Sequence, residues 1–466
     1  MYDEFLSLCG YSPEEISEQT PRVQKAFAKL GLNDEDIERG IERIRRFYAI
    51  DLESVRLLLG VWVKELVNTL MAGEEKKKII YSEWPGANCV LNLAGVAAYE
   101  DVHFATPVSQ TFMIVLGGIF GKLDPFLEAG ESSGLAPAQA HCGLWQMHVG
   151  VIANGIVPKP DLIITSQYIC DQAAEADQLL EDMYGIPVVY LDGCCDWQYG
   201  EMPSRRQVEL VAGRMHQIKR KVEEVCGAPF PEGAVLTGFK DMAKSYFFHK
   251  ALVDIMVEAD PQPISQANLD LVYFAQFTTL QHRKQYQQAS LAFARELKSV
   301  VEQGKGVVEK GAPRVYLAFR FPGQPDVYQM IGEFGLAVPL ALLDYLPPEE
   351  PDPNEYKDLM ETIAKSVYRN APPCTAYSNI RYNVESVKAF NLDGAIEFYP
   401  LGCRPYSITP LMIRKAISEE LGVPSVVLEW GGYDPRDYPA GQFRSRMETF
   451  AETVRLSKQA RENKGG

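Results

Sequence analysis

The first part of the chain, residues 1–78, carries apolar residues at helical spacing. Val55, Leu59, Trp62 and Leu66 recur three or four positions apart, as on one face of a helix. A run of charged residues then ends the pattern. The pattern predicts an N-terminal helical segment that caps the rest of the protein or forms a dimer contact.

Beyond residue 78 the pattern changes to short apolar runs that end in polar or glycine-containing turns. The runs IIYSEWPG, PDLIITSQ and IPVVYLDG are separated by stretches long enough for amphipathic helices, and the same rhythm returns in PRVYLAFR, DGAIEFYPLG and VPSVVLEWGG. Strands that alternate with helices are typical of a parallel sheet with crossover helices. We therefore predict a first α/β domain at 79–230, a helical bridge at 231–311 and a second α/β domain at 312–466.

The two predicted α/β domains resemble each other. The run LIITSQYIC ends at Cys170 and the run AIEFYPLGC ends at Cys403, so each combines a strand with a cysteine-bearing loop. Each is followed by a helix-length stretch and then by a second strand that opens on a Gly-x-Pro turn. This order predicts two Rossmann- or flavodoxin-like parallel-sheet domains related by internal duplication.

The charge of the chain narrows the function classes. The 466 residues include 46 Lys and Arg against 62 Asp and Glu, which gives a formal net charge of −16. A surface this acidic repels a phosphate backbone, so we do not expect nucleic-acid binding. The N-terminus has no signal-peptide pattern, and no stretch approaches a transmembrane helix in length and apolarity. We therefore expect a cytoplasmic protein without membrane contact.

Nine cysteines carry the candidate chemistry. Disulfides do not persist in the cytoplasm, so these residues are thiols or ligands. The chain lacks the paired Cys-x2-Cys knuckles of a structural zinc site, whereas an iron–sulfur cluster can draw thiolates from separate strand ends. Cys170 and Cys403 each follow a predicted strand, at the edge where parallel sheets bind ligands and where helix N-termini lower the pKa of a thiol. Either one alone also suits a small buried apolar residue, but two in equivalent positions favour a cluster.

Longer segments around these cysteines, taken together, match the sequence pattern of a known protein family. The segments are Ala140-His-Cys142, Pro158–Ser166, Ile169-Cys170-Asp171, Leu392–Ile396, Gly402–Tyr406 and the tail from Glu429 to Glu448. Together they resemble the 2-hydroxyacyl-CoA dehydratase and benzoyl-CoA reductase family. The resemblance spans residues 80–460 and leaves the N-terminal helical segment outside.

The resemblance implies a two-domain α/β subunit that holds an iron–sulfur cluster through three cysteines, which in this chain are Cys142, Cys170 and Cys403. It also implies an ATP-hydrolysing iron–sulfur activator protein as a transient electron donor, and either a homodimer or a homologous second subunit. The glycines at 117–121 lack the spacing and the following lysine of a Walker-type loop. We therefore expect no ATP site on this chain.

Four further cysteines depart from the common pattern of the family. They are Cys89, Cys194, Cys195 and Cys374. With these additional thiols, the chain resembles the branch of the family that contains double-cubane cluster proteins. These proteins are ATP-dependent reductases in which two joined cubanes need about six cysteine ligands. The cofactor is therefore predicted to be a [4Fe-4S] cluster or an [8Fe-9S] double cubane. The metal ligands predicted for the larger cofactor are Cys142, Cys170, Cys403, Cys89, Cys195 and Cys374, with Cys194 as a further cofactor-binding candidate.

His141, Glu83 and Arg404 are the candidate catalytic residues. An unperturbed imidazole changes its charge near neutral pH, so a histidine such as His141 suits a proton donor, although a residue at this position also suits a helix cap. Glu83 ends a predicted strand, where a carboxylate is more often a cap or an ion-pair partner. Arg404 suits an anionic or CoA-type substrate, or it balances the negative charge of a cluster.

These residues favour the catalytic iron–sulfur component of an ATP-dependent, activator-coupled reductase or dehydratase. Its substrate is expected to be an acyl-CoA thioester or a small unsaturated molecule. One alternative is a 2-hydroxyacyl-CoA dehydratase or benzoyl-CoA reductase subunit that works only in a heteromer. Another is an electron carrier without a substrate, and a third is a scaffold with inert thiols. Iron content separates the last of these from the others.

Overall fold

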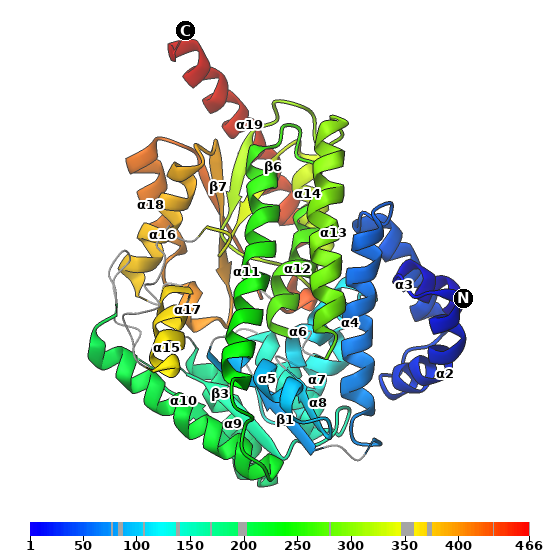
Figure 1. The fold of residues 1–466 in the computed structure, drawn as a ribbon. Coiled ribbons are helices and arrows are strands. Elements are labelled where there is room, and N and C mark those ends of the chain that lie inside the picture. The colour runs from blue at the N-terminus through cyan, green and yellow to red at the C-terminus, as the bar shows by residue number, and fades with distance from the viewer. Residues whose placement is uncertain are drawn as a thin grey trace.

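Two four-stranded parallel sheets form the framework of the computed structural model (Figure 1). The structure describes residues 1–75, 78–82, 87–105, 108–136, 140–167, 170–193, 203–278, 281–345, 358–370, 375–431 and 433–465. The strand order is β2-β1-β3-β4 in the first sheet and β6-β5-β7-β8 in the second. Both orders match the start of a flavodoxin-like sheet. The prediction of an α/β fold with two parallel-sheet domains is confirmed, and the domain boundaries stay a prediction.

The strands are short and largely buried. Those of the first sheet are β1 (Lys78–Ser82), β2 (Val102–Ala105), β3 (Leu162–Ser166) and β4 (Val188–Leu191). Those of the second sheet are β5 (Arg314–Leu317), β6 (Ala337–Ala341), β7 (Gly394–Pro400) and β8 (Ser425–Trp430). Helices cover both faces of a parallel sheet, so the sequences of its central strands are continuous apolar runs. In agreement with this, all five residues of β3 are buried.

The sequence analysis did not predict two of the strands, β2 and β6, and both lie at sheet edges. β2 has only four residues, and β6 contains Pro339. Proline cannot donate a hydrogen bond to a neighbouring strand, so the sequence of β6 argues against a central strand. The edge position of β6 removes this conflict.

The helices fall into four groups along the chain. The N-terminal group contains α1 (Tyr2–Leu8), α2 (Pro13–Lys29), α3 (Asp34–Phe47) and α4 (Glu53–Met71). The first sheet is accompanied by α5 (Ala87–Ala98), α6 (Val108–Phe112), α7 (Asp124–Ser132), α8 (Gly143–Ala153) and α9 (Asp171–Tyr184). A long helical stretch follows with α10 (Arg205–Cys226), α11 (Ala234–Glu258), α12 (Gln266–Thr278) and α13 (Arg283–Glu302). The second sheet is accompanied by α14 (Pro325–Glu333), α15 (Leu359–Asn370), α16 (Ala376–Ala389), α17 (Arg404–Ser407), α18 (Pro410–Leu421) and α19 (Ala440–Gly465).

The N-terminal helices pack against the bridge between the two sheets. α4 lies beside α12 and α13, and α11 lies beside α12 and α13, so these helices form a layer that runs along both sheets (Figure 1). The indole nitrogen of the buried Trp62 donates to the carbonyl of Leu271 at 3.1 Å, which ties α4 to α12. Within the described part of the chain, no helix combines the length and the apolar character needed to cross a membrane.

Candidate functional site

Three cysteines stand at the N-caps of helices. Cys142 precedes α8, Cys170 precedes α9 and Cys403 precedes α17. Cys170 follows β3 and Cys403 follows β7, which occupy equivalent places in the two sheets. The first backbone N–H groups of a helix have no partner within the helix, so each cysteine lies where those groups favour negative charge.

The three thiols lie close enough to affect one another. Burial raises the pKa of Cys403, and the thiols of Cys142 and Cys170 raise it further. Burial also raises the pKa of Cys170, and it raises the pKa of Cys142 to about 12. We call these residues the three-cysteine site. The lowered thiol pKa expected from helix N-termini is wrong for the metal-free site, because burial outweighs the effect of the N–H donors.

Hydrogen-bond donors nevertheless surround the sulfur atoms. Each bond favours the thiolate and opposes the effect of burial on its pKa. The donors are the backbone N–H groups of Leu144 and Trp145 to Cys142, those of Gln172 and Ala173 together with the Trp145 side chain to Cys170, and the backbone N–H of Tyr406 to Cys403. If a metal displaced the thiol protons, these donors would stabilise the thiolates.

Two further contacts fix the start of α8. Gln172 accepts from the backbone N–H of Cys142 at 3.4 Å and donates to the carbonyl of Ala140 at 3.1 Å. A Cβ added to Gly143 would lie 2.5 Å from the carbonyl oxygen of Tyr433, so only glycine allows this approach. The segment after β8 therefore reaches across to the cysteine of the first sheet.

Arg404 joins α17 to α9, two of the three helices that begin after a cysteine. Its guanidinium pairs with Asp171 at 2.6 Å and with Glu175 at 2.9 and 3.0 Å, both on α9. The pairs are partly exposed, because the Arg404 side chain is 47% exposed. In the structure the guanidinium of Arg404 is paired with two carboxylates of the same chain. Its role in substrate binding stays a prediction.

The other predicted residues lie in different surroundings. His141 is half-buried, and its Nδ1 atom has no hydrogen-bond partner within the described residues. The N-cap residue of α8 is Cys142 rather than His141. Cys89 lies in the first turn of α5, with its sulfur 3.9 Å from the carbonyl oxygen of Phe277. Glu83, Cys194, Cys195 and Cys374 lie outside the described residues.

A buried charged network was missed by the sequence analysis. Arg320, which follows β5, donates to Asp270 of α12 at 2.6 Å and to the carbonyl of Leu342 at 2.8 Å. It also pairs with Asp344, which follows β6. The three charged side chains are at most 3% exposed. Arg320 lowers the pKa of Asp344 against the opposing effect of burial, whereas burial raises the pKa of Asp270.

Tyr433 lies near both this network and the three-cysteine site. Burial raises its pKa well above the ordinary value. The nearby thiols of Cys142 and Cys403 raise the pKa further, and the carboxylate of Asp270 does so as well. The charged network therefore adjoins the site from the side of the second sheet. The one feature of the sequence that pointed to this network was Arg320, a single arginine at the end of the predicted strand PRVYLAFR.

The donor set suits a cluster rather than a single ion. Among the described residues, no group of three or more His, Cys, Asp or Glu side chains can hold one metal ion. A mononuclear ion needs every ligand atom at about 2 Å from one point, whereas a cluster binds each thiolate through a different iron. Three mutually interacting thiols, each with N–H donors, match the chemistry of the second case.

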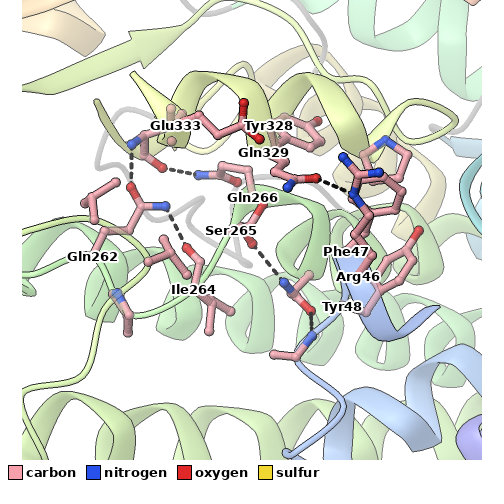
Figure 2. Close-up of a pocket in the computed structure, with 18 of the residues that line it drawn as sticks. Arg46, Phe47, Tyr48, Gln262, Ile264, Ser265, Gln266, Tyr328, Gln329 and Glu333 are labelled. Carbon is pink, nitrogen blue, oxygen red and sulfur yellow. Dashed lines mark hydrogen bonds between the residues drawn. The ribbon is translucent and has the colours of Figure 1, made fainter. Parts of the chain in front are cut away.

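A separate cavity lies at the opposite edge of the second sheet (Figure 2). It has a volume of about 390 Å³ and is lined by Tyr48, Gln262 and Gln266, among other residues. The Gln266 amide donates to the carbonyl of Val338 at 3.0 Å, near the amino-terminal end of β6. Because the cysteines follow the carboxyl ends of the strands, this cavity is distinct from the three-cysteine site.

Comparison with known proteins gives one consistent family. A family model described as 2-hydroxyglutaryl-CoA dehydratase, D-component, matches residues 106–454. The chain is 18% identical over 321 residues to the (R)-2-hydroxyisocaproyl-CoA dehydratase alpha subunit of Clostridioides difficile, which covers 67% of this chain and 77% of that subunit. It is 20% identical over 332 residues to the (R)-phenyllactyl-CoA dehydratase alpha subunit of Clostridium sporogenes, covering 69% and 77%. It is 22% identical over 319 residues to the lactoyl-CoA dehydratase alpha subunit of Anaerotignum propionicum, covering 66% and 72%.

Proposed function

The chain belongs to the 2-hydroxyglutaryl-CoA dehydratase D-component family, and from that premise we propose that it is the catalytic iron–sulfur component of a 2-hydroxyacyl-CoA dehydratase-type enzyme. The observation that carries the proposal is the convergence of three cysteines from two sheets, of which Cys142 and Cys170 are buried and Cys403 is partly buried. An ATP-hydrolysing iron–sulfur activator supplies low-potential electrons. The substrate is an acyl-CoA thioester, as the names of the relatives suggest, and a small unsaturated molecule is the alternative.

Cys142, Cys170 and Cys403 would hold a [4Fe-4S] cluster, which would supply one-electron transfer and an iron without a cysteine ligand. The protein contributes a dry environment, because Cys142 and Cys170 are at most 9% exposed. Its helix N-termini and the Trp145 side chain direct hydrogen-bond donors at the sulfur atoms. Donors of this kind stabilise negative charge and raise the reduction potential of an iron–sulfur site.

A second subunit is the partner that the relatives suggest, since each is an alpha subunit. Exposed apolar side chains lie just beyond Cys403: Ile408 is 70% exposed, Leu411 63% and Met412 51%. Their spacing places them on one side of the chain segment that enters α18. We assign this surface to a homologous second subunit, and the native mass after anaerobic purification would distinguish a heteromer from a homodimer.

Iron and sulfide analysis of the anaerobically purified chain tests the cluster. We expect about four iron atoms per chain for a single cubane, and less than one cubane per chain would refute the proposal. Changing Cys142, Cys170 or Cys403 to Ala should abolish iron retention, because each change opens a second iron to solvent. Cys9→Ala is the matched control: Cys9 is buried in the N-terminal helices and should be replaceable without loss of iron.

The additional thiols decide between the two cluster types. In a double cubane, the second half would draw on Cys89, Cys374 and one or both of Cys194 and Cys195. Cys89→Ser or Cys374→Ser should then remove about half of about eight iron atoms per chain. With a single cubane the same changes should leave the iron unchanged. Circular dichroism of each variant shows whether the fold is retained. Unchanged iron in both variants would exclude the double cubane.

A further inference from the structure

A histidine and an aspartate are paired between two of the helices that accompany the first sheet. The Nε2 atom of His148 on α8 lies 2.7 Å from Oδ1 of Asp177 on α9, and both side chains are 0% exposed. An ionised carboxylate can only accept a hydrogen bond, so the imidazole Nε2–H donates to it. The pair therefore joins the helix that begins after Cys142 to the helix that begins after Cys170.

A second hydrogen bond joins the same two helices at the cysteines. The backbone N–H of Cys142 donates to Oε1 of Gln172 at 3.4 Å, and Gln172 lies in the first turn of α9. The two connections are six residues apart on α8, from Cys142 to His148, and five apart on α9, from Gln172 to Asp177. At 1.5 Å per residue, these intervals advance about 9 Å and about 7.5 Å along the two helix axes. Nearly equal advances mean that the helices run side by side in the same direction, with both cysteines at the same end.

The two helices rest on different supports. α8 packs closely on α7, because a Cβ added to Gly130 or Gly150 would collide with the backbone of the other helix. α9 instead packs on β3 and β4. The hydrogen bonds of Gln172 and of the His148–Asp177 pair therefore fix α9 relative to a helix that is held from elsewhere.

A fully buried polar pair is a poor source of stability. Oδ2 of Asp177 is buried and has no hydrogen-bond partner within the described residues. Both side chains lose their hydration, and apolar side chains of similar volume in place of such a pair often leave stability unchanged or raise it. What an apolar pair lacks is direction, since a hydrogen bond fixes both the distance and the angle between two groups. Alignment of the two helices therefore explains the pair better than stability does.

We propose that His148 and Asp177 are positioning residues that hold α8 and α9 in the alignment at which the Cys142 and Cys170 thiols can bind one cluster. The proposal rests on the proposed iron–sulfur function for this consequence, whereas the alignment itself is a property of the metal-free chain. Neither side chain needs to reach the sulfur atoms. Each acts through the helix whose N-cap residue is the cysteine.

Cross-linking of the metal-free, full-length chain tests the alignment. Dibromobimane attaches to one thiolate with loss of bromide and then joins a second thiolate in the same way. In a Cys403→Ala parent chain, the fraction of singly attached reagent that goes on to join Cys142 and Cys170 reports how well these two thiols are held together, and peptide mass mapping identifies the joined pair. His148→Leu with Asp177→Leu should lower this fraction by about tenfold, the equivalent of one hydrogen bond to a charged group.

Iron release gives the corresponding measurement on the cluster-loaded protein. In the presence of a chelator, the double leucine variant should lose iron about 10- to 100-fold faster than the unmodified protein, as expected when a group that orients metal ligands is removed. Asp177→Asn keeps an oxygen that accepts from the imidazole, so it should retain both the cross-linking and the slow release.

A second His–Asp pair provides the matched control. The Nε2 atom of His216 lies 2.8 Å from Oδ2 of Asp358 and joins α10 to the residue before α15. Neither helix begins after one of the three cysteines. His216→Leu with Asp358→Leu should therefore leave the cross-linking and the rate of iron release unchanged.

The outcomes separate this inference from the proposed function. A double leucine variant that is folded by circular dichroism and cross-links Cys142 to Cys170 as readily as the parent chain would overturn the alignment. A loss in Asp177→Asn as large as that in the double variant would overturn it as well. Where the double variant does not fold, Asp177→Ala makes the same comparison, because it removes only the acceptor. Absent iron in the unmodified protein refutes the proposed function, and the cross-linking then decides the alignment by itself.

Discussion

Replacement of Arg320 by Met tests how strongly the buried charged network stabilises the second sheet. The change removes the guanidinium that pairs with Asp270 and Asp344, whose side chains are 1% and 0% exposed, and leaves Asp344 with His249, whose Nε2 atom lies 2.9 Å away. Loss of one partner of a buried ion pair costs about 3–5 kcal/mol. The guanidinium also lies 4.0 Å from the centroid of the Tyr273 ring, a desolvated contact that contributes about 2 kcal/mol. We expect the free energy of unfolding to fall by about 5 kcal/mol.

Urea unfolding followed by circular dichroism measures the loss. Arg320→Lys keeps the charge but cannot reproduce the forked contacts, so it should cost about half as much as Arg320→Met. Arg444→Met is the matched control: Arg444 pairs with Glu333 at 3.0 Å, but its side chain is 56% exposed. Such a pair contributes about 1 kcal/mol or less.

Two outcomes would refute this reasoning. In the first, Arg320→Met costs no more than Arg444→Met, which would mean that the buried carboxylates need no cation. In the second, adding Asp344→Asn to Arg320→Met restores no stability. The added change removes one of the two buried carboxylates that have lost the guanidinium, so the double variant should be more stable than Arg320→Met alone.

Further predictions concern packing, charge and pH. Gly150→Ala should lower the free energy of unfolding by about 1–3 kcal/mol, because the added Cβ would lie 2.5 Å from the backbone nitrogen of Gly130. Gly213→Ala on α10 is the control: its Cβ would meet nothing within 4 Å, so the change should be neutral or stabilising in the same urea titration. Arg404→Ala should lower the free energy of unfolding by about 1 kcal/mol or less and the effect should shrink in high salt, since its ion pairs are partly exposed. Burial raises the pKa of Glu397 from 4.5 to about 8, so the folded state retains a proton that the unfolded chain releases. Stability should therefore fall as the pH rises from about 4.5 to about 8, by on the order of 5 kcal/mol, and urea titrations of Glu397→Gln should show a smaller fall.

The sequence predicted the sheet framework and two of the three cysteines for one physical reason. Parallel strands end at a common edge, so a cysteine just past a strand end is placed without knowledge of side-chain packing. Cys170 and Cys403 follow this rule, and the structure brings them together. Cys142 does not follow a strand, and only the family resemblance singled it out. Its position depends on contacts of Gly143 and Gln172 that no local pattern encodes.

The buried charges could not be predicted in the same way. Arg320, Asp270 and Asp344 come from a loop, a helix and the end of an edge strand, and each is unremarkable in its own segment. Only packing brings them together. Glu397 is different, because it stands inside a continuous apolar run of a central strand. A parallel sheet is covered on both faces, so a carboxylate in such a run must be buried. That signal was present in the sequence and was not used.

The division of the site between the two sheets links metal binding to the arrangement of the domains. The first sheet supplies Cys142 and Cys170, and the second supplies Cys403. A cluster that needs all three thiolates binds only when the domains lie together, so its binding free energy adds to the free energy of that arrangement. Arg404 and the approach of Tyr433 to Gly143 connect the same two parts of the chain. Loss of the proposed cluster should therefore weaken the contact between the sheets, and the continuous buried core that runs through both sheets opposes their separation.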